Sequence, residues 1–170
     1  MPSTLHRHSR RRSLIFLDMW HCAMEYDELL RQIKSAFADA PAPSEDNIVC
    51  HECEECLALR NDVRGHTPDE LPDPWIERSF DQLPFFSDDA KRFYLPAFLR
   101  FAALKPDSLV AQFVLYALSD EFRMHPSGGY SAQQRQAIRD YLDYVERRVD
   151  DDDSDWEYLQ KAKALWRPGT

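Results

Sequence analysis

The stretch "PDSLVAQFVLYAL", residues 106–118, is the segment that decides the fold class. Its apolar residues fall on nearly every side of a helix: Leu109, Val110, Phe113, Val114, Leu115, Tyr116 and Leu118. A helix that is apolar all round is normally buried at the centre of a protein. The stretch therefore predicts a central helix around which the rest of the chain packs.

Segments on both sides of this stretch repeat apolar residues at the spacing of one helix face. They run from Tyr26 to Phe37, from Ile138 to Val149 and from Trp156 to Trp166. No segment shows the two-residue alternation of a strand. The sequence therefore predicts an all-α fold, a compact single-domain bundle of about six to seven helices.

Helix starts are marked by hydroxyl side chains that can bond to free backbone N–H groups. Ser87 precedes "DDAKRFY" in this way, while Thr67 with Glu70 and Ser131 with Gln134 have the spacing of capping boxes. These three positions predict three helix N-termini.

Pro96 interrupts the helical pattern of "FYLPAFLRFAAL", residues 93–104. A proline inside a helix removes one backbone hydrogen bond and clashes with the preceding turn. We expect a kink or a break between Tyr94 and Ala97. A bend that wraps the helix around a small core is favoured over a functional groove beside the proline.

Charge divides the chain unevenly. Residues 1–23 hold four arginines and one aspartate, a net charge of +3, so 17 basic and 29 acidic residues remain and give the rest −12. Nucleic-acid binding depends on cationic side chains that neutralise phosphates. An acidic body of this kind argues against nucleic acid as a ligand and favours a basic protein as a partner.

The first 23 residues do not resemble a secretory signal, because their apolar run, 14–17, has four residues. We expect 1–23 to be a disordered basic extension or a mis-assigned start, and 24–170 to form a single helical domain. No stretch is long and apolar enough to span a membrane. With three closely spaced thiols and no export signal, a cytoplasmic location is expected.

Three cysteines, Cys50, Cys53 and Cys56, stand at three-residue intervals in "NIVCHECEECLALR", residues 47–60. In a helix, Cys53 and Cys56 would share a face with Leu57, and Cys50 would precede the first turn. Free cysteine packs as a small apolar residue. Burial of Cys53 and Cys56 on the inner side of a short helix is the favoured interpretation.

A metal site is the alternative, with zinc as the ion and His51, Cys53, Cys56 and His66 as candidate ligands. Against it, the chain has no second pair of cysteine or histidine ligands at a typical spacing. An iron–sulfur motif would want a cysteine near position 60, where Arg60 stands. The redox interpretation of C-x-x-C lacks its βαβ context, and the neighbouring glutamates disfavour a reactive thiolate.

The known catalytic motifs are missing from the sequence. Its four glycines form no phosphate-binding loop and no nucleophile elbow. We assign no catalytic and no cofactor-binding residue, and an enzyme is the less favoured class.

The segments "DNIVCHECEEC", "RGHTPDELP" and "LPFFSDDAKRFYLPAFLRFAALKPDS" resemble a bacterial family of small uncharacterised helical proteins. The resemblance covers about residues 24–118, and its most specific element is "YLPAF", residues 94–98. It implies a bacterial cytoplasmic protein and carries no activity and no catalytic residues.

Three function classes follow from these observations. The favoured one is an acidic helical protein-binding module, similar to an immunity protein or inhibitor that presents carboxylates to a basic partner. The others are a small metal-stabilised domain and an enzyme of unknown class.

Overall fold

The computed structural model describes residues 25–120, 124–149 and 155–168. Within these ranges the chain forms seven α-helices, three short 3₁₀ helices and no strand, so the predicted all-α fold is confirmed. The α-helices are residues 25–37, α2 (Glu54–Val63), α3 (Asp73–Arg78), α4 (Asp88–Leu104), α5 (Leu109–Leu118), α6 (Ala132–Glu146) and α7 (Asp155–Leu165). The 3₁₀ helices are η1 (Glu45–Asn47), η2 (Pro68–Glu70) and η3 (Leu83–Phe85).

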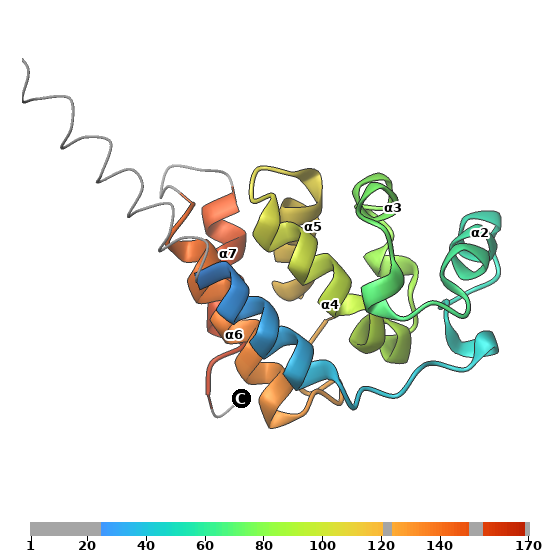
Figure 1. The fold of residues 1–170 in the computed structure, drawn as a ribbon, viewed down its shortest axis with the longest axis horizontal. Helices are drawn as coiled ribbons and strands as arrows, with labels where there is room; N and C mark the ends of the chain where they lie inside the picture. Colours follow the sequence, from blue (N-terminus) through green and yellow to red (C-terminus); the bar gives the residue numbers. More distant parts are fainter. Residues whose placement is uncertain (1–24, 121–123, 150–154, 169–170) are drawn as a thin grey trace, which may run out of the picture.

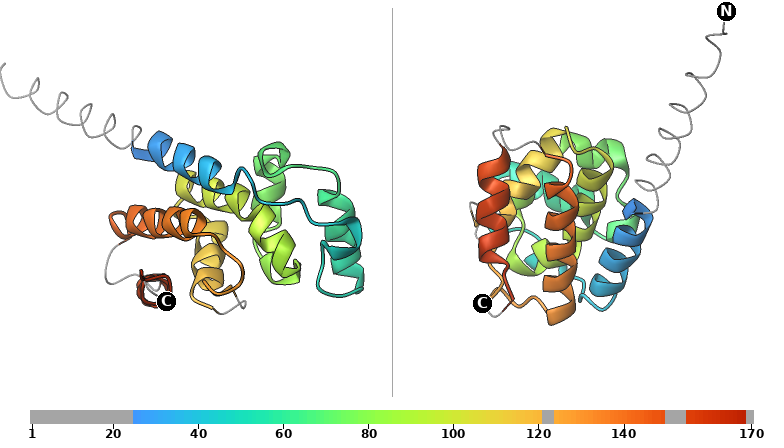
Figure 2. Two further views of the ribbon diagram at one scale, coloured as in Figure 1. Left: turned by 90° about the horizontal axis from the view of Figure 1, so that it is seen from below. Right: turned by 90° about the vertical axis from the view of Figure 1, so that its left-hand side faces the viewer.

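The helices pack as one bundle with α4 and α5 in its interior. α4 packs on α5, and α5 packs in turn on α7. Helix 25–37 runs beside α6, and α2 lies at one end of the long axis with α7 at the other (Figures 1 and 2). The elements around α2 are therefore remote from the packed end formed by α5, α6 and α7.

α5 is the central helix that its composition predicts. Its buried residues are Val110, Ala111, Val114, Leu115, Ala117 and Leu118. Leu109, in the first turn, has 55% of its surface exposed. Gln112, Phe113 and Tyr116 are half-buried, so α5 is buried on most but not all of its sides.

All three predicted helix caps form. The Ser87 hydroxyl accepts the N–H of Ala90 at the start of α4. Thr67 with Glu70 and Ser131 with Gln134 make reciprocal capping boxes at η2 and α6. These bonds satisfy N–H groups that the helix itself leaves without partners.

Pro96 lies inside α4, which continues through it from Asp88 to Leu104. The proline therefore does not end the helix. A pocket of about 310 Å³ lies beside it, with Phe37, Phe93 and Pro68 among its lining residues. Ten residues of α4 are buried, so packing on several sides holds the helix together despite the lost backbone bond.

Three buried aromatic side chains donate hydrogen bonds to carbonyls at helix C-termini. Tyr94 Oη donates to the Val63 carbonyl of α2 at 3.0 Å, and Trp166 Nε1 donates to the Leu118 carbonyl of α5 at 2.8 Å. Tyr144 Oη reaches the Ala103 carbonyl of α4 at 3.3 Å. The last four carbonyls of a helix have no partner within it. These side chains supply one while burying their rings.

Among the described residues, no helix has the length and apolarity needed to cross a membrane. The expectations for residues 1–23 fall outside the described ranges.

Candidate metal centre

The loop that carries the first cysteine is fixed to the segment before α4. Val49 and Phe86 form an isolated antiparallel bridge. On either side of it, the Cys50 N–H donates to the Phe85 carbonyl at 2.9 Å and the Ser87 N–H donates to the Ile48 carbonyl at 3.0 Å. The backbone at Cys50 is therefore held in place by a contact between segments far apart in the sequence.

Cys53 is the N-cap of α2 and does not lie on its inner face. Its backbone is extended, the helix begins at Glu54, and the Cys56 N–H donates to Cys53 Sγ at 3.3 Å. Cys53 is half-buried, whereas Cys56 is fully buried in the first turn. The prediction that both side chains lie on the inner face of the helix is thus correct for Cys56 and wrong for Cys53, because Cys53 precedes the first helical residue, Glu54.

Cys50, His51 and Cys56 come together at this helix terminus. One potential ligand atom from each lies within 4.8 Å of the others, and Cys56 Sγ is 3.3 Å from His51 Nδ1. Zinc bond lengths of about 2.3 Å to sulfur and about 2.0 Å to nitrogen imply tetrahedral edges of about 3.8 Å and about 3.6 Å. The group is therefore within about 1 Å of the spacing that a tetrahedral ion requires.

Of the four candidate ligands predicted from sequence, His51, Cys53 and Cys56 lie at this end of α2 and His66 does not. α2 has ten residues and is about 15 Å long. His66 is exposed and follows the C-terminus of the helix. Cys50 joins the cluster in its place, and the unbroken C-x₂-C-x₂-C spacing was the signal that pointed to it.

The thiol of Cys56 is held in its neutral form. Burial raises its pKa to about 12, and the neighbouring Cys53 contributes in the same direction. A metal ion that binds Cys56 must therefore displace its proton. The positive end of the α2 dipole and the Cys56 N–H bond to Cys53 favour thiolates once an ion is present.

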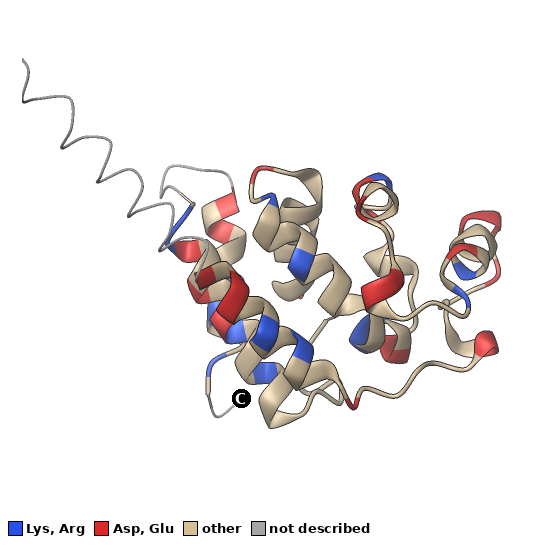
Figure 3. Ribbon diagram, viewed as in Figure 1, with Lys and Arg blue, Asp and Glu red and all other residues tan. Residues whose placement is uncertain are grey.

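Glu52, Glu54 and Glu55 surround the cluster and are exposed. None of the three has an ion pair or hydrogen bond among the described residues. Acidic segments mark α2 and the neighbouring η1 at this end of the molecule (Figure 3). The site thus combines soft ligands with an acidic rim that attracts cations.

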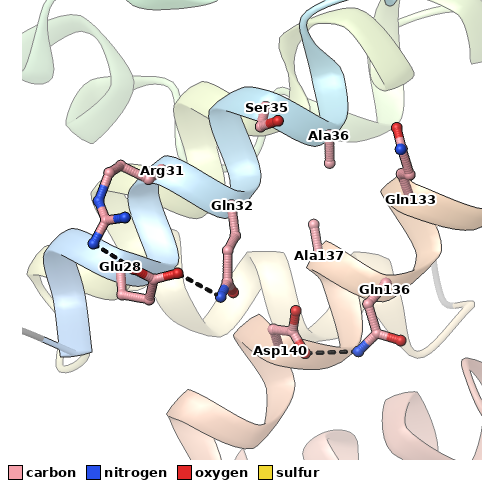
Figure 4. A pocket seen from close by; sticks show the side chains of 9 residues that line it. All are labelled: Glu28, Arg31, Gln32, Ser35, Ala36, Gln133, Gln136, Ala137 and Asp140. Atoms are coloured by element: carbon pink, nitrogen blue, oxygen red, sulfur yellow. Dashed lines mark hydrogen bonds and ion pairs between the residues drawn. The ribbon is translucent and has the colours of Figure 1, made fainter.

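The groove between helix 25–37 and α6 offers less chemistry. Its volume is about 520 Å³, and its polar side chains bond to one another (Figure 4). Gln32 donates to Glu28 at 2.9 Å, Arg31 pairs with the same carboxylate, and Gln136 donates to Asp140 at 2.7 Å. The residues that line it include no cysteine and no histidine. The cysteine cluster therefore remains the candidate site.

Residues 25–170 match a family model described as a family of unknown function (DUF6714). The match extends over the helical domain and agrees with an uncharacterised family. No curated protein and no solved structure matches the chain.

Proposed function

The chain belongs to the family of unknown function DUF6714, and we propose that it is a helical domain stabilised by one bound zinc ion. The ligands are Cys50, His51, Cys53 and Cys56. The ion joins the loop before α2 to the first turn of that helix. This closed set of four protein ligands is typical of a structural site.

The observation that carries the proposal is the convergence of Cys50, His51 and Cys56 within 4.8 Å. Cys53 lies outside that group but is the fourth ligand that we propose, because its sulfur accepts the Cys56 N–H at 3.3 Å and its side chain interacts with the Cys56 thiol. Packing alone accounts for the buried Cys56. It does not account for an exposed Cys50 and an exposed histidine beside it.

Zinc is the ion that this ligand set favours. Thiolate and imidazole ligands suit zinc, whereas calcium and magnesium take oxygen ligands. Three thiolates and a neutral histidine leave a zinc site with one negative charge. The N–H bond to Cys53 and the helix dipole stabilise that charge.

Metal analysis of the full chain, purified without chelator, tests the proposal. We expect about one zinc ion per chain, and we expect a chelator to lower the melting temperature. Cys56→Ser should lose the metal. His66→Gln is the matched control and should keep it, because His66 lies beyond the other end of α2.

Purified protein without stoichiometric metal, and with a melting temperature that a chelator leaves unchanged, would contradict the proposal. Equal metal content in Cys56→Ser and the unaltered chain would contradict it as well. Thiolate ligands need a reducing compartment. We therefore place the protein in the cytoplasm as part of the same proposal.

A second candidate function is the binding of a basic protein partner through the acidic rim. Glu52, Glu54 and Glu55 favour it, because they are exposed and have no counter-ion among the described residues. Carboxylates arranged in this way steer and select a cationic surface.

Comparison of the unaltered chain with Glu52→Gln/Glu54→Gln/Glu55→Gln tests this second function. We expect affinity purification followed by mass spectrometry to recover a basic protein with the unaltered chain. The triple variant should lose that protein, and recovery should fall as salt rises. Identical recovery with both chains would exclude the rim as the binding surface.

A further inference from the structure

The three thiols of the cluster differ in their access to solvent. Cys50 is exposed, Cys53 is half-buried and Cys56 is fully buried. Cysteines that react with peroxide are accessible and often stand beside a second cysteine that resolves the oxidised product. Cys50 and Cys56 have this relation, with their sulfur atoms within 4.8 Å of each other.

The Cys50 side chain is held by one weak hydrogen bond, whereas its backbone is fixed by a stronger one. The Cys50 N–H donates to the Phe85 carbonyl at 2.9 Å, and the Cys50 thiol donates a weak hydrogen bond to the Pro84 carbonyl at 3.7 Å. A disulfide needs the two sulfurs about 2.05 Å apart. The two sulfurs already lie within 4.8 Å, so the disulfide requires them to approach by at most about 2.8 Å, at the loss of the weak Pro84 bond.

Cys53 is the poorer partner for Cys50. Its sulfur accepts the Cys56 N–H at the start of α2, and a disulfide would draw it away from that cap. It also lies outside the group whose ligand atoms are within 4.8 Å of one another.

The acidic rim determines which oxidant reaches the site. Glu52, Glu54 and Glu55 repel anionic oxidants such as oxidised glutathione. Hydrogen peroxide is small and neutral and does not meet this barrier. The charge around the cluster therefore selects a neutral hydroperoxide.

We propose that Cys50 is a modification site for a neutral hydroperoxide, and that Cys56 resolves it as a Cys50–Cys56 disulfide. The loss of zinc that accompanies this reaction rests on the proposed function. The disulfide removes two of the four ligands, so the ion leaves. Oxidation would thus remove the metal link between the loop and the start of α2.

The chemistry balances in two steps. The Cys50 thiolate attacks one peroxide oxygen, the O–O bond breaks, and sulfenic acid and hydroxide form, the hydroxide becoming water with one proton. The Cys56 sulfur then attacks the Cys50 sulfur, the S–O bond breaks, and the second water leaves. Two thiols lose two electrons and two protons in all, and one peroxide becomes two waters.

The experiment uses the zinc-loaded full chain with Cys22→Ser, so that only the cluster cysteines react. After treatment with hydrogen peroxide and alkylation, a glutamate-specific protease cuts after Glu52, Glu54 and Glu55. These cuts place Cys50, Cys53 and Cys56 on separate peptides. We expect a single linked pair, Cys50 with Cys56, and a parallel release of about one zinc ion per chain, both reversed by a thiol reductant and added zinc.

Cysteine variants and a second oxidant identify which cysteine reacts with peroxide and which one resolves the product. Cys50→Ser should form no disulfide, and Cys53→Ser should still form the Cys50–Cys56 pair. Cys56→Ser should accumulate sulfenic acid on Cys50, trapped by dimedone. If Cys56→Ser does not fold, a brief dimedone pulse in the parent chain must label Cys50. Oxidised glutathione should react more slowly than peroxide, and the difference should shrink in Glu52→Gln/Glu54→Gln/Glu55→Gln.

A disulfide that contains Cys53, or dimedone label on Cys53, would overturn the inference. Zinc that stays bound after peroxide treatment would also overturn it while leaving the proposed function intact. In contrast, a chain without zinc that still forms the Cys50–Cys56 disulfide would retain the modification site and reject the metal site.

Discussion

Tyr94 and Tyr141 are both buried, but only one has a partner for its hydroxyl. Tyr94 Oη donates to the Val63 carbonyl at 3.0 Å, whereas Tyr141 Oη has no partner among the described residues. A buried polar group that lacks a partner costs about 1–3 kcal/mol, and a satisfied hydrogen bond contributes about 1 kcal/mol. Comparison of the two tyrosines therefore measures the effect of a bonded hydroxyl against that of an unbonded one.

Tyr94→Phe should lower the free energy of unfolding by about 1 kcal/mol, because it removes one of the two donors to the Val63 carbonyl, which also accepts the His66 N–H at 3.0 Å. Tyr141→Phe should leave it unchanged or raise it by about 1 kcal/mol. Urea unfolding of both variants measures the difference. Equal losses would show that the bonded hydroxyl of Tyr94 contributes no more to stability than the unpartnered hydroxyl of Tyr141.

Buried tyrosines also make stability depend on alkaline pH. Burial raises the pKa of Tyr94, Tyr130 and Tyr141 above the ordinary value of 10.0. Below pH 10 the folded and unfolded forms are both protonated at these sites, so their contribution is constant. Above pH 10 the unfolded chain loses these protons first, and stability falls by up to about 1.4 kcal/mol per pH unit for each tyrosine.

Urea unfolding between pH 8 and 11 should therefore show a decline that begins near pH 10. Tyr141→Phe should have a shallower decline, since it removes one of the groups that the unfolded chain ionises first. Parallel curves for the two proteins would mean that Tyr141 ionises equally easily in the folded state.

At the scale of elements, the loop before α6 is held to α4 by one arginine. Arg92 donates to the Gly128 carbonyl and pairs with Asp89 in its own helix. Gly129 follows with φ +84°, and a Cβ there would lie 2.8 Å from Arg92 Nη1. Gly65, after α2, has a similar φ of +78° but open space around it.

Gly65→Ala should cost about 1–2 kcal/mol, the strain of a side chain in the left-handed region. Gly129→Ala should cost more, because it adds displacement of Arg92 to the same strain. Denaturant unfolding of the pair separates the two contributions. Equal losses would show that Arg92 moves aside freely and does not hold the loop.

The helices could be predicted from sequence because their causes are local. Ser87, Thr67 and Ser131 stand next to the N–H groups that they cap, and the apolar spacing of 138–149 marks its own buried face. Pro96 is the exception, because its presence in the sequence suggests a break that α4 does not have. Whether it breaks α4 depends on the packing of the buried residues around it, and that packing comes from elsewhere in the chain.

The candidate site could be predicted only in part, because its membership depends on a long-range contact. The cysteine spacing identifies the segment. The position of Cys50 in the cluster is fixed by the Val49–Phe86 bridge, which holds the loop against the segment before α4. Sequence spacing carries no information about such a long-range contact, and His66 lies beyond the other end of the ten-residue helix α2.

At the scale of the whole molecule, the candidate metal centre and the main core lie in different places. α2 lies at one end of the long axis (Figure 1) and buries only Cys56, Leu59 and Val63 of its ten residues. α4, in contrast, buries ten residues. An element with so few buried contacts opens at a low free energy unless something else holds it. In the proposed function, the zinc ion is what holds it.

Removal of the metal should therefore loosen one end of the molecule and leave the rest intact. We expect amide hydrogen exchange of the chelated protein to accelerate in residues 48–63, while the amides of α4 and α5 keep their protection. Tyr94 Oη still joins α4 to the Val63 carbonyl at the end of α2, so Tyr94→Phe should accelerate exchange in 48–63 further. His66→Gln with zinc bound should exchange like the unaltered chain. Uniform acceleration across all helices would show instead that the ion supports the whole bundle, and unchanged exchange in 48–63 would show that α2 holds its place without it.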